Sequence, residues 1–122
     1  MATEPTEPKQ HERSPDFVHR YANHVAFELN ALDVRMVFGT TEKDAPTSQH
    51  TAITMTWAEA KILHHYLSGN LMIYEGLEGK IRIPSGAIPP PPPSLKEGAS
   101  PERIAVANAL RKLYDEFVAE QA

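Results

Sequence analysis

The distribution of proline limits how this chain can fold. Eleven prolines occur in 122 residues, and five of them form the run Pro89–Pro93. Proline lacks a backbone N–H donor and has a fixed φ, so this run can form neither a helix nor a central strand, and polyproline II is expected. We therefore predict a proline-rich linker at residues 89–99, between a body at residues 17–88 and a C-terminal segment at residues 100–122.

The N-terminal segment has almost no apolar side chains and contains three further prolines. A segment that buries little apolar surface cannot offset the entropy lost on ordering, so residues 1–16 are predicted to be a disordered tail. This segment has no apolar h-region, and no apolar run in the chain approaches the roughly 20 residues of a membrane span. We expect a cytoplasmic protein that does not insert into a membrane.

Three segments of the body alternate between apolar and polar side chains, which is the pattern of a β-strand. They are His24–Leu29, Leu32–Phe38 and Thr51–Met55. The first two are close enough for a tight hairpin, with Leu32 on its apolar face. The simplest arrangement is an antiparallel meander with one wet face and one covered face. Lys80–Ile83, which Pro84 ends, is a candidate fourth strand.

A helix from Trp57 to about Tyr74 is predicted to cover this sheet. Thr56 and Glu59 have the spacing of a capping box at its start. Its apolar residues form two stripes, and the sheet needs to cover only one of them. The second stripe consists of Ile62, Tyr66 and Ile73. The predicted fold class is α+β, with a meander of three to four antiparallel strands covered by one long helix.

A C-terminal amphipathic helix is predicted after the linker. Ser100 suits its N-cap, and Pro101 suits its first helical position. Its apolar face contains Val106, Leu110, Leu113 and Phe117. Because such a helix is marginal alone, we expect this face to dock on the second stripe, in the same chain or in another copy. The alternative is a free helix that awaits a foreign protein.

No motif indicates catalysis. The chain has no cysteine, which excludes thiolate nucleophiles and zinc–thiolate sites. His64 and His65 are adjacent on the predicted helix and point about 100° apart, so they cannot both face one metal ion. Acid–base catalysis needs two titratable groups in one pocket, and nothing in the pattern places two carboxylates together. No phosphate-binding glycine motif is present. We predict no catalytic residue, no metal site and no cofactor, and hence no enzyme.

The predicted function is that of a self-associating interaction module, most simply a homodimer. A body of about 70 residues buries only about 60% of its unfolded surface, and the wide apolar arc of its helix requires a further covering surface. The alternative is a nucleic-acid-associated regulator, because a two-stranded ribbon can enter a major groove and Lys80 lies near Arg82. The net charge of −4, from 16 acids and 12 bases, disfavours that alternative.

Several short pieces of the body occur in a familiar order. They are Tyr21–Val25, Asp33–Gly39, Ala60–Leu63, Asn70, Tyr74–Glu75 and Gly79–Ile81. With these pieces the chain resembles DUF3467, a small bacterial family of unknown function, over about residues 21–83. The resemblance implies a soluble bacterial protein and carries no activity, cofactor or site. It includes neither the acidic tail nor the proline run and last helix.

Overall fold

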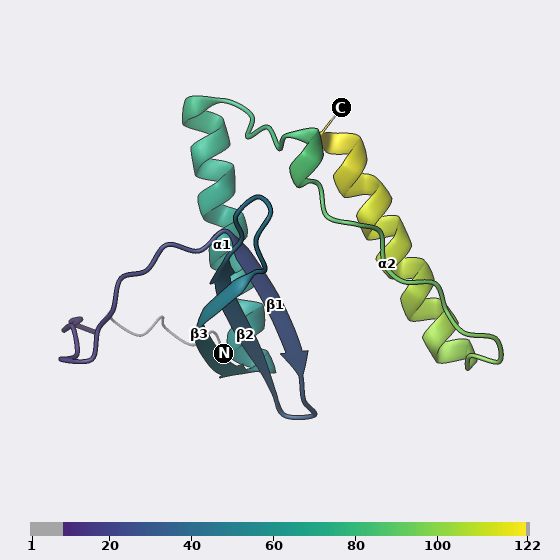
Figure 1. The fold of residues 1–122 in the computed structure, drawn as a ribbon, viewed down its shortest axis with the longest axis horizontal. Coiled ribbons are helices and arrows are strands. Elements are labelled where there is room, and N and C mark those ends of the chain that lie inside the picture. The colour runs from purple at the N-terminus through teal and green to yellow at the C-terminus, as the bar shows by residue number, and fades with distance from the viewer. Residues whose placement is uncertain (1–8, 122) are drawn as a thin grey trace, which may run out of the picture. The chain divides into compact units, whose positions relative to one another are not determined.

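A computed structural model of the chain describes residues 9–121 (Figure 1). It contains β1 (His24–Leu29), β2 (Asp33–Thr40), β3 (Ser48–Thr56), α1 (Trp57–Glu78), the 3-10 helix η1 (Ser85–Ala87) and α2 (Pro101–Glu120). The predicted α+β class is confirmed: an antiparallel meander is followed by a long helix and a C-terminal helix. The chain divides into two compact units, one up to Leu67 and one from Ser68 onward.

Part of the predicted tail lies outside the described residues. The prediction of a disordered segment covers residues 1–16, and residues 1–8 are not described. Residues 9–16 have exposed side chains and form neither helix nor strand. Local contacts are present at the end of this stretch: the Phe17 N–H donates to the Ser14 carbonyl over 2.9 Å, and the Arg13 guanidinium lies 4.6 Å from the centroid of the Phe17 ring.

The sheet of the first unit has the strand order β1-β2-β3, and both pairings are antiparallel. Phe27, Met36 and Ile53 lie side by side in one row across the three strands. Because side chains alternate along a strand, this face also carries Val34, which is 3% exposed. Among residues 9–121 the buried apolar side chains are those of Val34, Met36 and Val37, all on the central strand.

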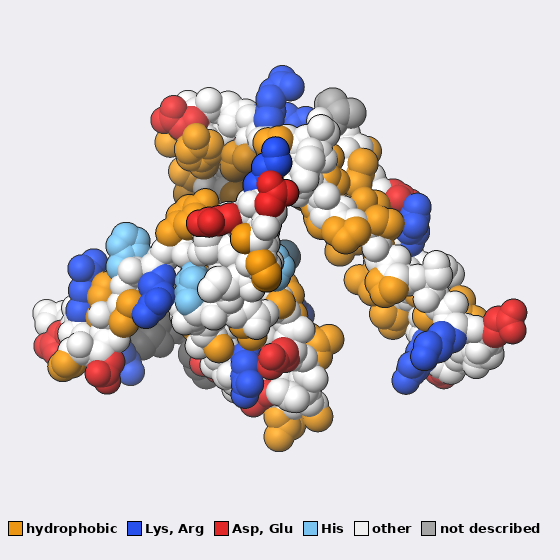
Figure 2. Space-filling model, viewed as in Figure 1, with side chains coloured by type: hydrophobic (Ala, Val, Ile, Leu, Met, Phe, Trp, Pro, Cys, Tyr) orange, Lys and Arg blue, Asp and Glu red, His pale blue; other side chains and the backbone are white. Residues whose placement is uncertain are grey.

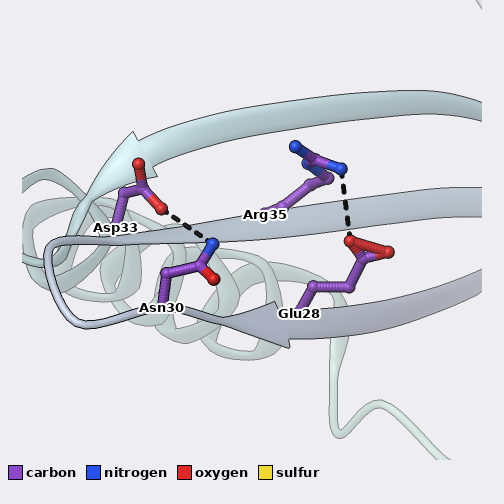
Figure 3. Close-up of polar contacts among 4 residues, drawn as sticks. All are labelled: Glu28, Asn30, Asp33 and Arg35. Atoms are coloured by element: carbon purple, nitrogen blue, oxygen red, sulfur yellow. Dashed lines mark hydrogen bonds and ion pairs between the residues drawn. The ribbon is translucent and has the colours of Figure 1, made fainter.

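The turn between β1 and β2 is longer than predicted and takes in Leu32. The Asn30 N–H donates to the Asp33 carbonyl over 3.0 Å, and the Asn30 side-chain amide donates to an Asp33 carboxylate oxygen over 3.0 Å (Figure 3). These bonds start β2 at Asp33. Leu32 was predicted on the apolar face, but it lies in the turn and is 84% exposed.

A β-bulge interrupts the pairing of β2 with β3 near the C-terminal end of β2. Phe38 pairs with Thr51, whereas Gly39 pairs with Gln49, so His50 is the extra residue. A Cβ atom at Gly39 would lie 2.5 Å from the carbonyl oxygen of Ser48. Glycine is therefore required here, because the backbone of β3 comes too close for any side chain.

Helix α1 begins directly after β3. The predicted capping box forms: the Glu59 N–H donates to the Thr56 hydroxyl over 3.1 Å, and the Thr56 N–H donates to a Glu59 carboxylate oxygen over 3.0 Å. The Trp57 indole N–H donates to the Asn30 carbonyl over 2.9 Å, which joins the helix start to the β1–β2 turn. All of these bonds are made by residues at the start of the helix.

The helix leaves much of the sheet open. Within the described chain, contacts between elements join β1 to β2 and β2 to β3, and α1 does not pack closely on a strand. All α1 side chains are exposed except that of Ala60, which is half-buried. The expected covering layer is therefore incomplete, and the Trp57 bond ties the helix to the sheet unit at its first turn.

The second unit contains the end of α1, the segment that follows it, and α2. The α1 helix ends at Gly79, which has a φ of 103° and donates its N–H to the Glu75 carbonyl. The predicted fourth strand at Lys80–Ile83 does not form. The Ile81 N–H donates to a Glu75 carboxylate oxygen over 2.9 Å, so it is not available to a strand ladder.

The predicted start of α2 is confirmed. Ser100 is its N-cap, and its hydroxyl accepts a hydrogen bond from the Arg103 N–H over 3.3 Å. Pro101 occupies the first helical position, where no N–H is needed. One exposed ion pair lies along the helix, between Arg111 and Asp115, at 3.3 Å. Such a pair adds little to stability, so α2 depends on its apolar contacts.

Candidate interaction surfaces

The apolar face of the sheet is open on its β1 side. Val25, Phe27 and Leu29 share this face with Val34 and Met36, yet they are 42%, 59% and 69% exposed. A side chain on a central strand is flanked on both sides, whereas one on an edge strand is flanked on one side only. The difference in exposure follows from the edge position of β1, and Ile53 on the other edge strand is likewise 47% exposed.

The free edge of β1 presents the backbone groups of the same three residues. Asn30 bonds to β2 through its own N–H, and alternate residues of an antiparallel strand point their N–H and C=O groups the same way. The backbone N–H and C=O groups of Ala26 and Glu28 therefore point toward β2. Those of Val25, Phe27 and Leu29 point away from it. Within residues 9–121, β1 pairs with β2 alone. The strand carries no proline and no lysine, the residues that commonly protect a sheet edge.

The opposite face of the hairpin carries a charged pair together with Val37, which is 9% exposed. Arg35 on β2 lies opposite Glu28 on β1, and the guanidinium is 3.3 Å from the carboxylate (Figure 3). Both side chains are more than half exposed, so the pair contributes little to stability. Arg35 is the only lysine or arginine in the three strands. The sheet therefore has no basic stripe.

The third strand is flanked by the segment that precedes β1. An open pocket of about 680 Å³ is lined by Val18, Arg20 and Ala22 together with residues 50–53 of β3. The His50 ring nitrogens lie 3.0 Å from the Tyr21 carbonyl oxygen and 2.7 Å from the Thr51 hydroxyl. The contact with Tyr21 joins the segment before β1 to β3 at the bulge residue His50.

Asn23 fixes the end of this segment. Its side-chain amide donates to the Thr41 carbonyl over 3.0 Å, and its side-chain oxygen accepts from the Thr41 N–H over 2.7 Å. Asn23 thus forms a two-bond clamp between the start of β1 and the end of β2. The sequence pattern gave no indication of this clamp, because its two residues are distant in the chain.

In the second unit the proline run lies along α2 (Figure 1). The Tyr114 hydroxyl donates to the Pro89 carbonyl over 3.0 Å. Two open apolar grooves follow, of about 470 and 380 Å³, which meet at Pro92 and Leu110. Figure 2 shows hydrophobic side chains gathered along α2. The prolines therefore do more than connect two elements, because they supply one wall of an apolar surface.

The predicted interface residues on α2 line these grooves. Val106 lines one groove, Leu113 and Phe117 line the other, and Leu110 lines both. Phe117 is half-buried, and the other three are 47–64% exposed. Phe117 also lines a smaller pocket with Leu71 and the segment after α1. The structure thus brings the four residues together with prolines, which the sequence analysis did not foresee.

The predicted second stripe on α1 is exposed throughout. Ile62, Tyr66 and Ile73 are 53%, 64% and 61% exposed. Ile62 and Tyr66 belong to the first unit, and Ile73 belongs to the second. All three are candidates for an interface, and their docking with α2 stays a prediction.

The titratable groups show little sign of a reaction centre. The described residues contain no group of three or more histidines and carboxylates that could hold a metal ion. A hydrogen bond from the Thr56 N–H, and a second from its hydroxyl, lower the pKa of Glu59 below its ordinary value. This shift follows from helix capping. Within the same residues, no helix is long and apolar enough to cross a membrane.

A family model described as "Protein of unknown function (DUF3467)" matches residues 2–83. The chain belongs to this family. The match begins at residue 2 rather than near Tyr21, so the DUF3467 region includes the acidic N-terminal segment that the resemblance had left out. It ends at residue 83, before the proline run and α2. No curated protein and no solved structure matches the chain.

Proposed function

We propose that this DUF3467 protein is a self-associating interaction module without enzymatic activity, and that its working form is a homodimer. The observation that supports this proposal is the small amount of burial in the sheet. Within residues 9–121, the buried apolar side chains all belong to β2. A small sheet needs a second layer or further strands for independent stability, and clustered exposed apolar side chains mark interaction sites.

The structural roles of the acidic groups support a non-enzymatic function. Glu28 pairs with Arg35, Glu59 caps α1, and Glu75 accepts the Ile81 N–H. Each contact is local and exposed, whereas general acid–base catalysis needs two titratable groups held in one pocket. These carboxylates are explained by the elements that they stabilise, so we assign them no reaction.

The nucleic-acid alternative finds less support in the sheet. A β-ribbon that enters a DNA groove needs basic side chains to contact phosphates. The three strands offer Arg35 alone, and Glu28 neutralises it. The protein is therefore better suited to another protein surface than to a polyanion.

Light scattering coupled to gel filtration tests the proposal. At micromolar concentration we expect a particle of twice the chain mass of 13.6 kDa. Because the exposed surfaces are apolar, this mass should change little between low and high salt. A particle of one chain mass at every concentration contradicts the homodimer. Retention on immobilised DNA that falls steeply with salt favours the nucleic-acid alternative instead.

The apolar face of α2 is a second surface within this proposal. We propose that this face docks on the second stripe of α1 in the working form, in the same chain or in the second copy. The face consists of Val106, Leu110, Leu113 and Phe117, and the stripe consists of Ile62, Tyr66 and Ile73. Leu113→Asp should then lower the melting temperature or the particle mass. Asn108→Asp adds the same charge at a position of α2 that lines neither groove, and it should change neither quantity. If neither variant changes the melting temperature or the particle mass, α2 is undocked in the isolated protein and awaits a foreign protein.

A further inference from the structure

We propose that two copies of the chain pair through β1, antiparallel to one another about a two-fold axis at Phe27. The two three-stranded meanders would then form one continuous six-stranded sheet. This inference rests on the proposed homodimer and names its surface. It follows from three observations. The outward backbone groups of β1 are free, its side chains are arranged symmetrically about Phe27, and the other edge strand, β3, has a contact with the segment before β1.

The backbone groups at this edge are arranged to accept another strand. Val25, Phe27 and Leu29 point their N–H and C=O groups away from β2, because the intervening residues use theirs within the hairpin. In an antiparallel pairing centred on Phe27, Phe27 faces Phe27 of the partner subunit. Val25 then faces Leu29 of the partner subunit, and Leu29 faces Val25 of the partner subunit. Each such pair exchanges two N–H···O bonds, so every outward group of the three residues is used.

The side chains select this register over its neighbours. With the axis at Phe27, Glu28 lies opposite Ala26 of the partner subunit on the face that carries Arg35. A pairing centred on Glu28 places two glutamates directly opposite each other, which is destabilising. A pairing centred on Ala26 leaves Leu29 opposite the partner subunit's Asn23, outside β1 and already bonded to Thr41. The pairing centred on Phe27 avoids both faults.

The exposure of the β1 side chains is consistent with a second β1 strand as the partner. Phe27 is 59% exposed although Met36, in the same row, is 7% exposed. A second β1 strand would supply the flank that Phe27 lacks and would place two aromatic rings against each other across the axis. The opposite edge strand differs at one end, where His50 contacts the Tyr21 carbonyl and an open pocket separates residues 18–22 from β3.

The first test compares two lysine variants in the full-length chain. Phe27→Lys places two ammonium groups across the proposed axis, and we expect the particle mass to fall to one chain mass. Ile53→Lys is the matched control: Ile53 lies in the same row and on the same face, but on the other edge strand, and is 47% exposed. It should leave the dimer intact. Trp57 fluorescence verifies that both variants keep the first unit folded, since the indole contacts the β1–β2 turn.

The second test uses cysteine pairs and does not depend on weakening the protein. The chain has no natural cysteine. Facing residues of a hydrogen-bonded antiparallel pair have Cα atoms about 5.5 Å apart, within disulfide range. Oxidation should therefore link Phe27→Cys to itself, and should link Val25→Cys to Leu29→Cys only when the two variants are mixed. Two copies of Val25→Cys lie roughly 14 Å apart and should not link. Ile53→Cys serves as the control that does not link.

The outcomes separate this inference from the proposed function. A wild-type protein of one chain mass contradicts both. A wild-type dimer that persists in Phe27→Lys, with no link in Phe27→Cys, overturns the β1 pairing and leaves the homodimer standing. Loss of the dimer in both lysine variants indicates that the apolar faces stack on each other, and it also overturns the edge pairing.

Discussion

The sheet unit and the proline–α2 unit achieve order in different ways. Backbone ladders between β1, β2 and β3 hold the sheet, and a slip of one residue in a strand would break the row of Phe27, Met36 and Ile53. The second unit has a helix beside a proline segment, which offers no N–H donors, and the Tyr114–Pro89 bond joins the two. The sheet should therefore behave as one cooperative structure, whereas α2 should detach more easily. The family match does not follow this division: it continues past Leu67 into the second unit and ends at residue 83, before the prolines.

Two spectroscopic signals distinguish the regions. Trp57 is the chain's single tryptophan, and its indole N–H bonds to the β1–β2 turn, so its fluorescence reports on the sheet unit. The circular dichroism signal of helices includes α2, which has no tryptophan. A perturbation of either unit should therefore move one signal more than the other.

The largest effect is expected from truncation in the centre of the sheet. Met36→Ala removes most of a side chain that is 7% exposed, and such changes cost about 2–5 kcal/mol of unfolding free energy. Urea unfolding followed by Trp57 fluorescence measures the loss. Ile53→Ala, in the same row but 47% exposed, should cost clearly less. Equal costs for the two variants would mean that Met36 and Ile53 are equally covered in solution.

A smaller loss is expected at the bulge. Gly39→Ala places a Cβ atom against the Ser48 carbonyl, and overpacking of this kind costs about 1–3 kcal/mol. Gly69→Ala is the opposite case: it lies within α1 with open space around it, and it should stabilise the helix by about 0.5–1 kcal/mol. Thermal melting of both variants verifies the opposite signs. A neutral Gly39→Ala would show that β2 and β3 are farther apart there.

The next variant tests the second unit alone. Tyr114→Phe removes the hydroxyl that bonds to Pro89, and a hydrogen bond of this type contributes about 0.5–1.5 kcal/mol. The helical signal should be lost at a lower temperature while the Trp57 transition stays unchanged. A parallel shift of both transitions would contradict the independence of the two units.

The smallest expected effect is the loss of stability at acidic pH that comes from Glu59. The pKa of Glu59 is lowered in the folded protein, first by the Thr56 N–H and then by its hydroxyl. A depressed carboxyl pKa gives stability that is present above the unfolded pKa and is lost as the pH falls through the folded pKa. Acidification should therefore weaken the start of α1, and Glu59→Gln should show less of this pH dependence. Melting temperatures at neutral and acidic pH, compared for wild type and variant, measure the difference.

The elements were predictable where the chain repeats a local pattern. Alternation located β1 and the body of β2, and the spacing of Thr56 and Glu59 located the start of α1 to the residue. Ser100 and Pro101 did the same for α2. Leu32 was misplaced because a turn residue can share the parity of the strand that follows it. Alternation alone cannot tell the two cases apart.

The surfaces were less predictable, because they depend on contacts between distant residues. Proline predicts an extended segment but not what lies beside it, so the packing of Pro89 against Tyr114 had no local signal. The role of Gly39 depends on how closely β3 approaches. The four α2 residues were found by their helical spacing. The open edge of β1 becomes visible only when the register of the hairpin shows which backbone groups face outward.

The unequal edges of the sheet bear on how far assembly can proceed. A sheet that joins copies at both edges grows without limit into a filament, while one that joins at a single edge is complete after two copies. The segment before β1 reaches β3 through the contact between His50 and the Tyr21 carbonyl and leaves β1 unoccupied, so in a dimer paired through β1 this segment would be placed to limit pairing at β3. Replacement of this segment by a flexible sequence should turn a finite particle into fibrous material. The short stretch before the first strand would then set the size of the assembly.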